Sequence, residues 1–278
     1  MSGYQEQVVA TLIVNVVSAY AAYLTLACGQ LNLGIAGFMA IGAYMSAMLG
    51  GAGWGLGASI ATATFVAGFV GAAIAYPALR ARGIYFTIAT LAFSEIVSAL
   101  LVNIPAVGGA SGMAVAGHLS MIPMLCTGLG LVAVVFFLAD TRFGLCLTAI
   151  RNDPQGAEVF GVRVRRIEVI AFVIGALLAG AAGALYAHHF NYVEAQQFNV
   201  SLSTFAVLYA LLGGLQTPVG PLVGATLFTV APELLRGADQ WRYAAFGAAI
   251  VLLMTFRPEG LFTRALIHGW AQRRASAP

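Results

Sequence analysis

The chain has 278 residues, of which 60% are hydrophobic and 8% are charged, and its formal net charge is +3. A soluble domain of this length would carry about a quarter charged residues, so the composition excludes a soluble fold and predicts an all-α, polytopic membrane protein. All 13 basic residues are Arg, and the lack of Lys excludes a Walker A ATPase and a Schiff-base enzyme, because both need the Lys amine.

Several apolar runs are long enough to cross a bilayer, because about 20 helical residues cover the ~30 Å hydrocarbon core. The second, seventh and ninth runs are short or broken by Gly, so about eight to ten transmembrane helices are expected in one membrane domain over residues 1–278. The predicted spans are Val8–Cys28, Leu33–Leu49, Leu56–Leu79, Ile84–Val102, Ile122–Ala139, Ile167–His188, Val200–Leu215, Val219–Leu235 and Tyr243–Phe256.

Basic residues predict the orientation of the chain, because cytoplasmic loops of membrane proteins are enriched in Arg and Lys. If the polar segment 140–166 is cytoplasmic, every Arg lies on that side except Arg236 and Arg242. The N-terminus would then lie outside if Leu33–Leu49 spans the membrane, and inside if that segment is re-entrant.

Two segments far apart in the chain resemble each other. Leu31–Tyr44 aligns with Phe198–Leu211 so that Asn32 matches Asn199, and in the predicted topology the two run in opposite directions. This pattern suggests an inverted repeat, an arrangement that places binding and gating residues near the middle of the membrane. Asn32 is therefore a candidate residue of the transport pathway.

The fourth predicted span contains Glu95, an acid well inside an apolar segment. Ionisable residues within a membrane are functional candidates, because a charge in hydrocarbon is costly. Three roles remain open for Glu95: a structural or gating contact between helices, a neutral protonated group, or an ion-coupling site.

The only long polar stretch is 140–168, which lies between two predicted spans and holds nine of the 23 charged residues. Phe143, Leu147 and Ile150 have helical spacing, which predicts an amphipathic helix over Arg142–Arg151. A second helix is predicted over Pro154–Phe160.

Local signals at both ends define this second helix. Asp153 is a capping residue, Pro154 suits the first helical position, and Gly161 suits a left-handed C-terminal cap. So short a helix is not stable alone in water, and it carries the apolar Val159 and Phe160 at its end. It either docks in a groove of a soluble partner or lies on the lipid headgroups.

Small residues recur in the sixth and later spans. Gly180 and Gly183, with Gly175 before them, are expected on a face where another helix packs closely. The turn Leu212–Gly224 either lines the pathway within the membrane or forms an ordinary turn at the cytoplasmic edge. Its candidate pathway or gating residues are Gly213, Gly214, Pro218 and Gly220.

Several motifs together resemble the permease subunits of branched-chain amino-acid ABC importers, of the LivM type. They occur in order from about residue 24 to 260. The matching segments are Gly29–Gly34, Leu79–Phe86, Thr90–Ile96, Thr141–Gly144, Ala149–Asp153, Ala157–Val162, Ala179–Tyr186 and Leu212–Leu215.

The resemblance implies a multi-pass permease of a bacterial inner membrane, in contact with lipid. It also implies a second, homologous permease, two cytoplasmic ATPase subunits and a periplasmic solute-binding protein as partners. No catalytic residue, metal, cofactor or nucleic acid is expected on this chain. The coupling helix that would dock in the ATPase includes Arg151, Asp153, Pro154, Ala157, Glu158, Phe160 and Gly161.

Two other classes of protein remain as alternatives to the importer permease. An ion-coupled secondary transporter would use Glu95 and would work without partners. A polytopic membrane enzyme is disfavoured, because His, Asp and Ser do not gather at one depth of the predicted topology.

Overall fold

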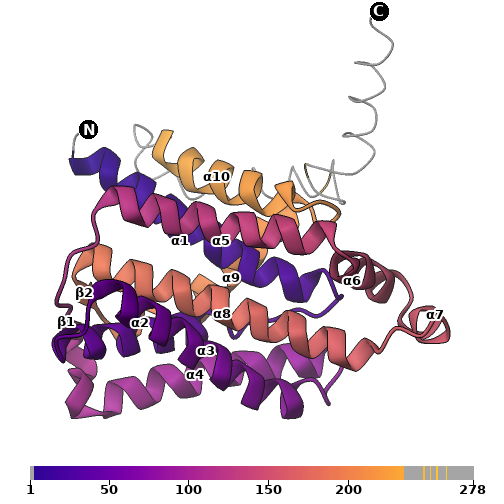
Figure 1. The fold of residues 1–278 in the computed structure, drawn as a ribbon, viewed down its shortest axis with the longest axis horizontal. Coiled ribbons are helices and arrows are strands. Elements are labelled where there is room, and N and C mark those ends of the chain that lie inside the picture. Colours follow the sequence, from indigo (N-terminus) through magenta and orange to yellow (C-terminus); the bar gives the residue numbers. More distant parts are fainter. Residues whose placement is uncertain (1–2, 235–246, 248–250, 252–254, 256–260, 262–278) are drawn as a thin grey trace, which may run out of the picture.

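The computed structural model describes residues 3–234 and the isolated positions 247, 251, 255 and 261. Most of this part is helical, and the long helices lie side by side along the long axis of the molecule (Figure 1). The helices are α1 Gly3–Leu26, α2 Ile35–Gly51, α3 Leu56–Ala78, α4 Ile84–Asn103, α5 Met121–Asp140, α6 Arg142–Asn152, α7 Pro154–Val159, α8 Val164–Phe190, α9 Val200–Gly213 and α10 Val219–Leu234.

The prediction of an all-α membrane protein is confirmed. Among the described residues, five helices are long and apolar enough to cross a membrane, namely α1, α3, α4, α5 and α8. Helices α2 and α9 have 17 and 14 residues and correspond to the second and seventh spans, which were predicted to be short, while α10 has 16 residues and corresponds to the eighth span. The predicted span Tyr243–Phe256 lies outside the described residues.

The boundaries differ from the prediction mainly at α1. This helix begins at Gly3 rather than Val8, because its exposed polar first turns continue the helix beyond the apolar segment. It ends at Leu26, and residues 27–34 then return toward the start of α2.

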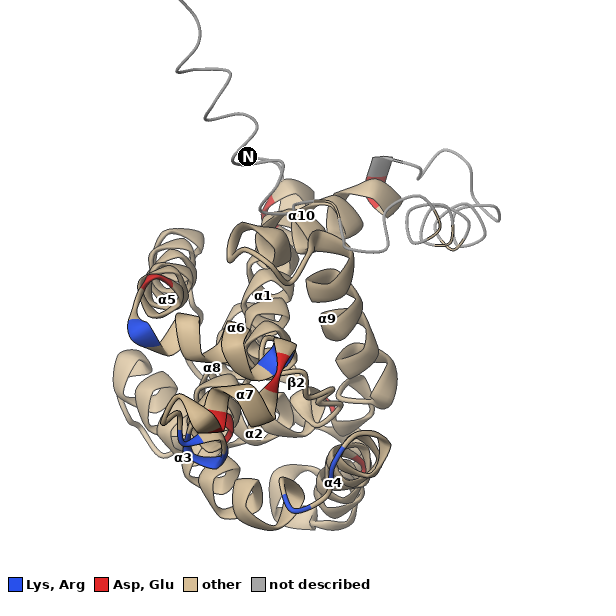
Figure 2. Cartoon of the chain, turned by 90° about the vertical axis from the view of Figure 1, so that its right-hand side faces the viewer, with Lys and Arg blue, Asp and Glu red and all other residues tan. Residues whose placement is uncertain are grey.

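Helix α8 forms the centre of the bundle, with α1, α2 and α3 packed against it (Figure 2). The backbones of α2 and α8 approach so closely that a Cβ atom on Gly42 would lie 2.0 Å from the carbonyl oxygen of Gly180. Phe38 of α2 packs edge-on against Phe172 of α8, with 5.6 Å between ring centroids. This contact between small and aromatic residues forms the buried core.

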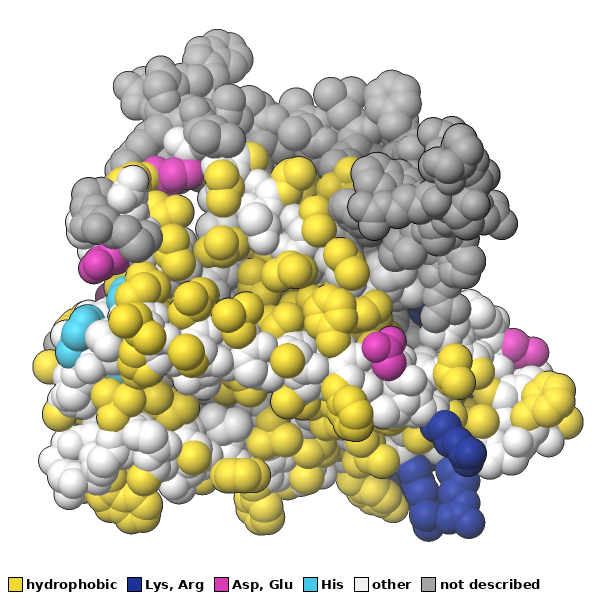
Figure 3. All heavy atoms as spheres, turned by 45° about the horizontal axis from the view of Figure 1, so that its top comes forward, with side chains coloured by type: hydrophobic (Ala, Val, Ile, Leu, Met, Phe, Trp, Pro, Cys, Tyr) yellow, Lys and Arg dark blue, Asp and Glu magenta, His cyan; other side chains and the backbone are white. Residues whose placement is uncertain are grey.

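The two ends of the bundle carry different elements. Helices α6 and α7 protrude at one end, whereas residue 3 lies near the other end (Figure 1). There β1 (Met113–Ala114) pairs antiparallel with β2 (Tyr192–Val193). Figure 3 shows Arg side chains gathered at the α7 end, His at the opposite end and hydrophobic side chains between them. If the α7 end is cytoplasmic, residue 3 lies outside.

Helices α2 and α9 meet near their N-terminal ends, where the backbone N–H of Ala36 donates to Ser203 Oγ at 2.9 Å. The alignment that matches Asn32 with Asn199 also matches Ala36 with Ser203. The two helices run in opposite directions from this contact, because α2 ends beside Ala116 near the β1–β2 end, whereas α9 leads to Leu215, which bonds Arg151 of α6. A contact between matched residues is expected at the pseudo-two-fold axis of an inverted repeat, so this contact supports the repeat.

Candidate functional site

Helix α7 is held by the local signals that the sequence predicted. Asp153 caps it, since its side-chain Oδ1 accepts a hydrogen bond from Gln155 N at 3.0 Å, and Pro154 occupies the first turn. At the other end Gly161 has φ +83°, and Val162 N donates to Ala157 O at 3.0 Å. These bonds close a Schellman motif, which ends the helix one residue before the predicted Phe160.

The tip of α7 is unusual because it is apolar and faces outward. Val159 is 85% exposed and Phe160 is 89% exposed, and the neighbouring Glu158 is also exposed. Ala157 on the opposite side is buried and turns toward the bundle. The fold therefore presents an apolar pair beside a carboxylate at the extreme end of the molecule.

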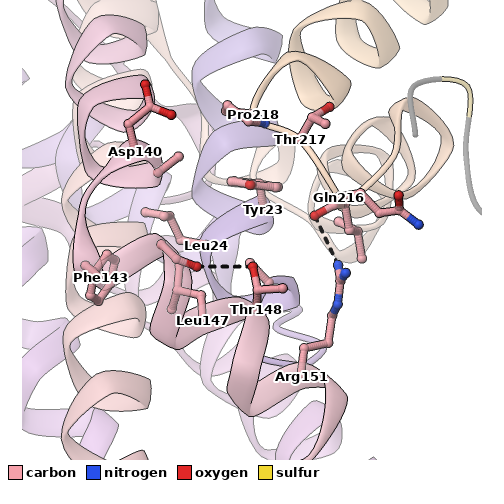
Figure 4. Close-up of a pocket in the computed structure, with 14 residues that line it drawn as sticks. Tyr23, Leu24, Asp140, Phe143, Leu147, Thr148, Arg151, Gln216, Thr217 and Pro218 are labelled. Atoms are coloured by element: carbon pink, nitrogen blue, oxygen red, sulfur yellow. Dashed lines mark hydrogen bonds between the residues drawn. The ribbon is translucent and has the colours of Figure 1, made fainter. Parts of the chain in front are cut away.

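Helix α6 connects α7 to the bundle. Its side chains Leu147 and Ile150 are buried, as the amphipathic pattern predicted. Arg151 lies half-buried near its end, and its Nη1 donates to the carbonyl oxygen of Leu215 at 3.0 Å (Figure 4). Arg151 therefore points inward, to the turn between α9 and α10, and not outward with the α7 tip.

The α9–α10 turn is compact because glycine backbones touch within it. A Cβ atom on Gly213 would lie 1.9 Å from Gly220 O, and one on Gly220 would lie 1.9 Å from Gly214 O. The carbonyl oxygen of Pro218 accepts a hydrogen bond from the Tyr20 hydroxyl of α1 at 2.7 Å. The turn is therefore attached on two sides, to α1 through Tyr20 and to α6 through Arg151.

A cavity of about 170 Å³ lies between α1, α6 and this turn. Tyr23, Asp140, Thr148 and Thr217 are among its lining side chains (Figure 4). Within the described part of the chain, the buried Thr217 hydroxyl has no hydrogen-bond partner. Arg151 and Leu215 also line this cavity.

The structure places Asn32 and Glu95 away from α6, α7 and the α9–α10 turn. Asn32 is buried before α2, and its Oδ1 accepts from Gly34 N at 2.8 Å. Thr90 Oγ1 of α4 accepts from Leu33 N at 3.1 Å, which fixes the same segment. Asn32 therefore supports the entry to α2, while Glu95 lies on an exposed face of α4.

The small residues of α8 lie at its contacts with three neighbours. A Cβ atom on Gly175 would be 2.9 Å from Ala21 O of α1, and one on Gly183 would be 1.9 Å from Met39 O of α2. A Cβ atom on Gly180 would lie 2.3 Å from the side chain of Ala67 of α3. Each position needs Gly, because the neighbouring backbone or side chain occupies the space of a larger residue.

A larger cavity, of about 410 Å³, lies between α1 and α9 and was missed by sequence reasoning. The described residues that line it are uncharged. A signal in the sequence was the presence of isolated polar residues inside or next to apolar spans. They include Asn15 and Ser18 of α1, Tyr186 of α8, Gln197, and Ser201 and Tyr209 of α9.

Metal binding receives no support from residues 3–234. No group of three or more His, Cys, Asp or Glu side chains there could hold a metal ion. The cysteines Cys28, Cys126 and Cys146 are all free.

Comparison with known proteins gives a family match and a related permease that agree with each other. Residues 5–256 match the family model described as "Branched-chain amino acid transport system / permease component". The chain is 30% identical over 271 residues to the high-affinity branched-chain amino acid transport system permease protein LivM of Escherichia coli K12, an alignment that covers 84% of this chain and 64% of LivM. The chain thus spans less than two thirds of the length of that relative.

Further relatives are named as permeases for branched-chain amino acids or for autoinducer 2. The chain is 24% identical over 233 residues to a probable branched-chain amino acid transport permease protein LivM of Methanocaldococcus jannaschii, covering 73% of this chain and 67% of the relative. It is 32% identical over 135 residues to the autoinducer 2 import system permease protein LsrC of Yersinia pseudotuberculosis, covering 46% of this chain and 38% of the relative. No solved structure matches the chain.

Proposed function

The chain belongs to the family of branched-chain amino acid transport permeases, and from that premise we propose that it is the membrane-spanning permease subunit of an ABC importer in a bacterial inner membrane. Its partners would be a second permease, two cytoplasmic ATPase subunits and a periplasmic solute-binding protein. The solute would be a branched-chain amino acid or a related small neutral compound. The ion-coupled alternative is not supported, because the relatives are named as permeases of transport and import systems.

The observation that carries this proposal is the apolar tip of α7. Fully burying one large apolar side chain contributes about 1.5–3 kcal/mol, and Val159 and Phe160 are both left in the open. A hydrophobic groove in an ATPase subunit would bury both, and a basic residue at its edge would pair with Glu158. This arrangement favours docking over a loop that merely rests on the headgroups.

Arg151 offers a route from the docked helix to the transport pathway. Movement of α7 is passed to α6, because Gly161 and Asp153 hold α7 in one short rigid unit beside it. The Arg151–Leu215 hydrogen bond then links α6 to the α9–α10 turn. Because α9 lines the 410 Å³ cavity, a displaced turn would change that cavity as the ATPases close.

The test is the double variant Val159→Ser, Phe160→Ser in the assembled transporter. We expect loss of the ATPase subunits on purification and loss of uptake, with the permease still present in the membrane. The matched control is Ile84→Ser, which removes another exposed apolar side chain at the same end of the bundle. If the double variant retains its ATPases and imports normally, α7 is not the docking site.

A second variant separates docking of the ATPase on α7 from transmission of its movement to the α9–α10 turn. Arg151→Gln leaves the α7 tip intact but loses the charge that strengthens the bond to Leu215. We expect the ATPases to remain bound and to hydrolyse ATP, while uptake falls about tenfold, as a loss of about 1.4 kcal/mol would predict. Uptake that stays coupled in this variant would exclude Arg151 from the route.

A further inference from the structure

Glu95 lies at membrane depth in α4. Its position in the 20-residue helix places its backbone about 12 Å from the Asn103 end and about 16 Å from the Ile84 end, at about 1.5 Å per residue. A hydrocarbon core of ~30 Å covers the whole of that helix. The carboxyl group therefore lies near the middle of a helix that is long enough to span the membrane.

The side chain points away from its own bundle. The opposite side of α4 is the buried one, with Phe86, Thr90 and Ser94 packed toward α2 and α8. Glu95 is exposed, and none of the hydrogen bonds or ion pairs of residues 3–234 involves it. The chain thus carries an intramembrane carboxyl group whose partner lies outside the described bundle.

Lipid is a poor partner for this face. Acidic side chains in a membrane face protein or water, because hydrocarbon offers no hydrogen-bond donor. Ala92 and Ala99 flank Glu95 on the same side of the helix, and both are exposed. Small residues on either side of a polar group allow a second helix to approach and to contact that group.

We propose that this outer face of α4, centred on Glu95, receives the second permease subunit, and that Glu95 accepts a hydrogen bond from a donor on that subunit. The inference rests on the proposed function. An ATPase docked on α7 cannot reach this depth, and neither can a solute-binding protein at the β1–β2 end, so the occupant is itself membrane-embedded. Helix α9 lies on the same side of the bundle (Figure 2) and exposes Ser201 and Thr204, which extends the polar surface.

The experiment places the photo-crosslinker benzoylphenylalanine at one position at a time in the assembled transporter, in native membranes. Ile96, beside Glu95, is 58% exposed, and Leu129 on α5 is 60% exposed and serves as the matched control. We expect Ile96 to form an adduct that mass spectrometry identifies as a permease of the same family, or as a second copy of this chain. Leu129 should form no protein adduct.

A third crosslinker at Phe160 separates this inference from the proposed function. If Phe160 captures an ATPase and Ile96 captures no protein, the proposed importer function is supported and the proposed subunit contact on α4 is wrong. Labelling of Ile96→Cys by a charged thiol reagent would then assign the face to a water-filled route. If Ile96 captures a permease but Phe160 captures no ATPase, the subunit contact on α4 is supported and the coupling role of α7 is contradicted.

Discussion

Helices α4 and α5 have the same length of 20 residues, and both leave most of their side chains at least partly exposed in the single chain. Leu129 of α5 lies as far from Met121 as Glu95 of α4 lies from Asn103, so the two positions have similar depths. At that depth α5 presents Leu, and α4 presents a carboxyl group. The described outer face of α5 is otherwise apolar apart from Cys126 and Thr127, and Asp140 at its end.

The difference separates two kinds of exposed surface in a membrane protein. An apolar face needs no partner, because lipid tails are as apolar as Leu. A face with a carboxyl group at mid-depth needs a donor that lipid cannot supply. In our proposal, exposure in a single chain therefore marks lipid contact on α5 and a subunit contact on α4.

The largest expected effect comes from placing an acid on the lipid-facing helix. Leu129→Glu should cost about 3 kcal/mol, the insertion penalty of a charged residue at a helix centre. The amount of folded protein in the membrane should then fall about a hundredfold, measured against an unaffected protein in the same membranes. The control Leu129→Met keeps the surface apolar and should behave as the native chain.

A folded Leu129→Glu variant at native levels would contradict the comparison. It would mean that α5 also faces a subunit or a water-filled space, and Leu129 would no longer serve as a negative control for crosslinking.

The second-largest effect is expected at Glu95, where replacement should affect the isolated chain and the assembled transporter in different ways. Glu95→Leu should leave the isolated chain as stable as before or more stable in detergent, because it removes a carboxyl group without a described partner. In the assembled transporter the same change should lower the yield of the second permease about tenfold, because a buried donor loses its acceptor. Glu95→Gln keeps an acceptor oxygen and should lose less. Both yields are measured by quantitative mass spectrometry after purification.

Equal yields for the native chain and for the Glu95→Gln and Glu95→Leu variants would remove the distinction between the two helices. Helix α4 would then be a lipid-facing element like α5.

The features that sequence reasoning predicted well are local ones. The α7 helix follows from Asp153, Pro154 and Gly161, because capping depends on residues within one turn of each end. Long apolar runs gave the spans, since composition and length decide whether a segment can cross a membrane. The family followed from motifs in the right order, which the match over residues 5–256 confirms.

The features that escaped prediction depend on contacts between distant segments. The sequence placed Arg151 with the coupling helix, but its guanidinium group reaches Leu215, which is 64 residues away. The cavity between α1 and α9 also joins residues that are far apart in the chain. The direction in which Glu95 points depends on how α4 packs against α2, and helical periodicity could not decide it in a segment that is apolar on every side.

The smallest expected effect comes from adding a single methyl group to α5, on its open side or on its packed side. A Cβ atom on Gly130 would meet nothing within 4 Å, whereas one on Gly128 would lie 2.5 Å from Ile13 Cγ2 of α1. Gly130→Ala should therefore stabilise the isolated chain by about 0.5–1 kcal/mol, through the lower cost of ordering Ala in a helix. Gly128→Ala should destabilise it by about 1–3 kcal/mol, because Ile13 must move in a packed contact. Thermal unfolding in detergent measures both changes, and the same sign for the two variants would show that α5 has no open side.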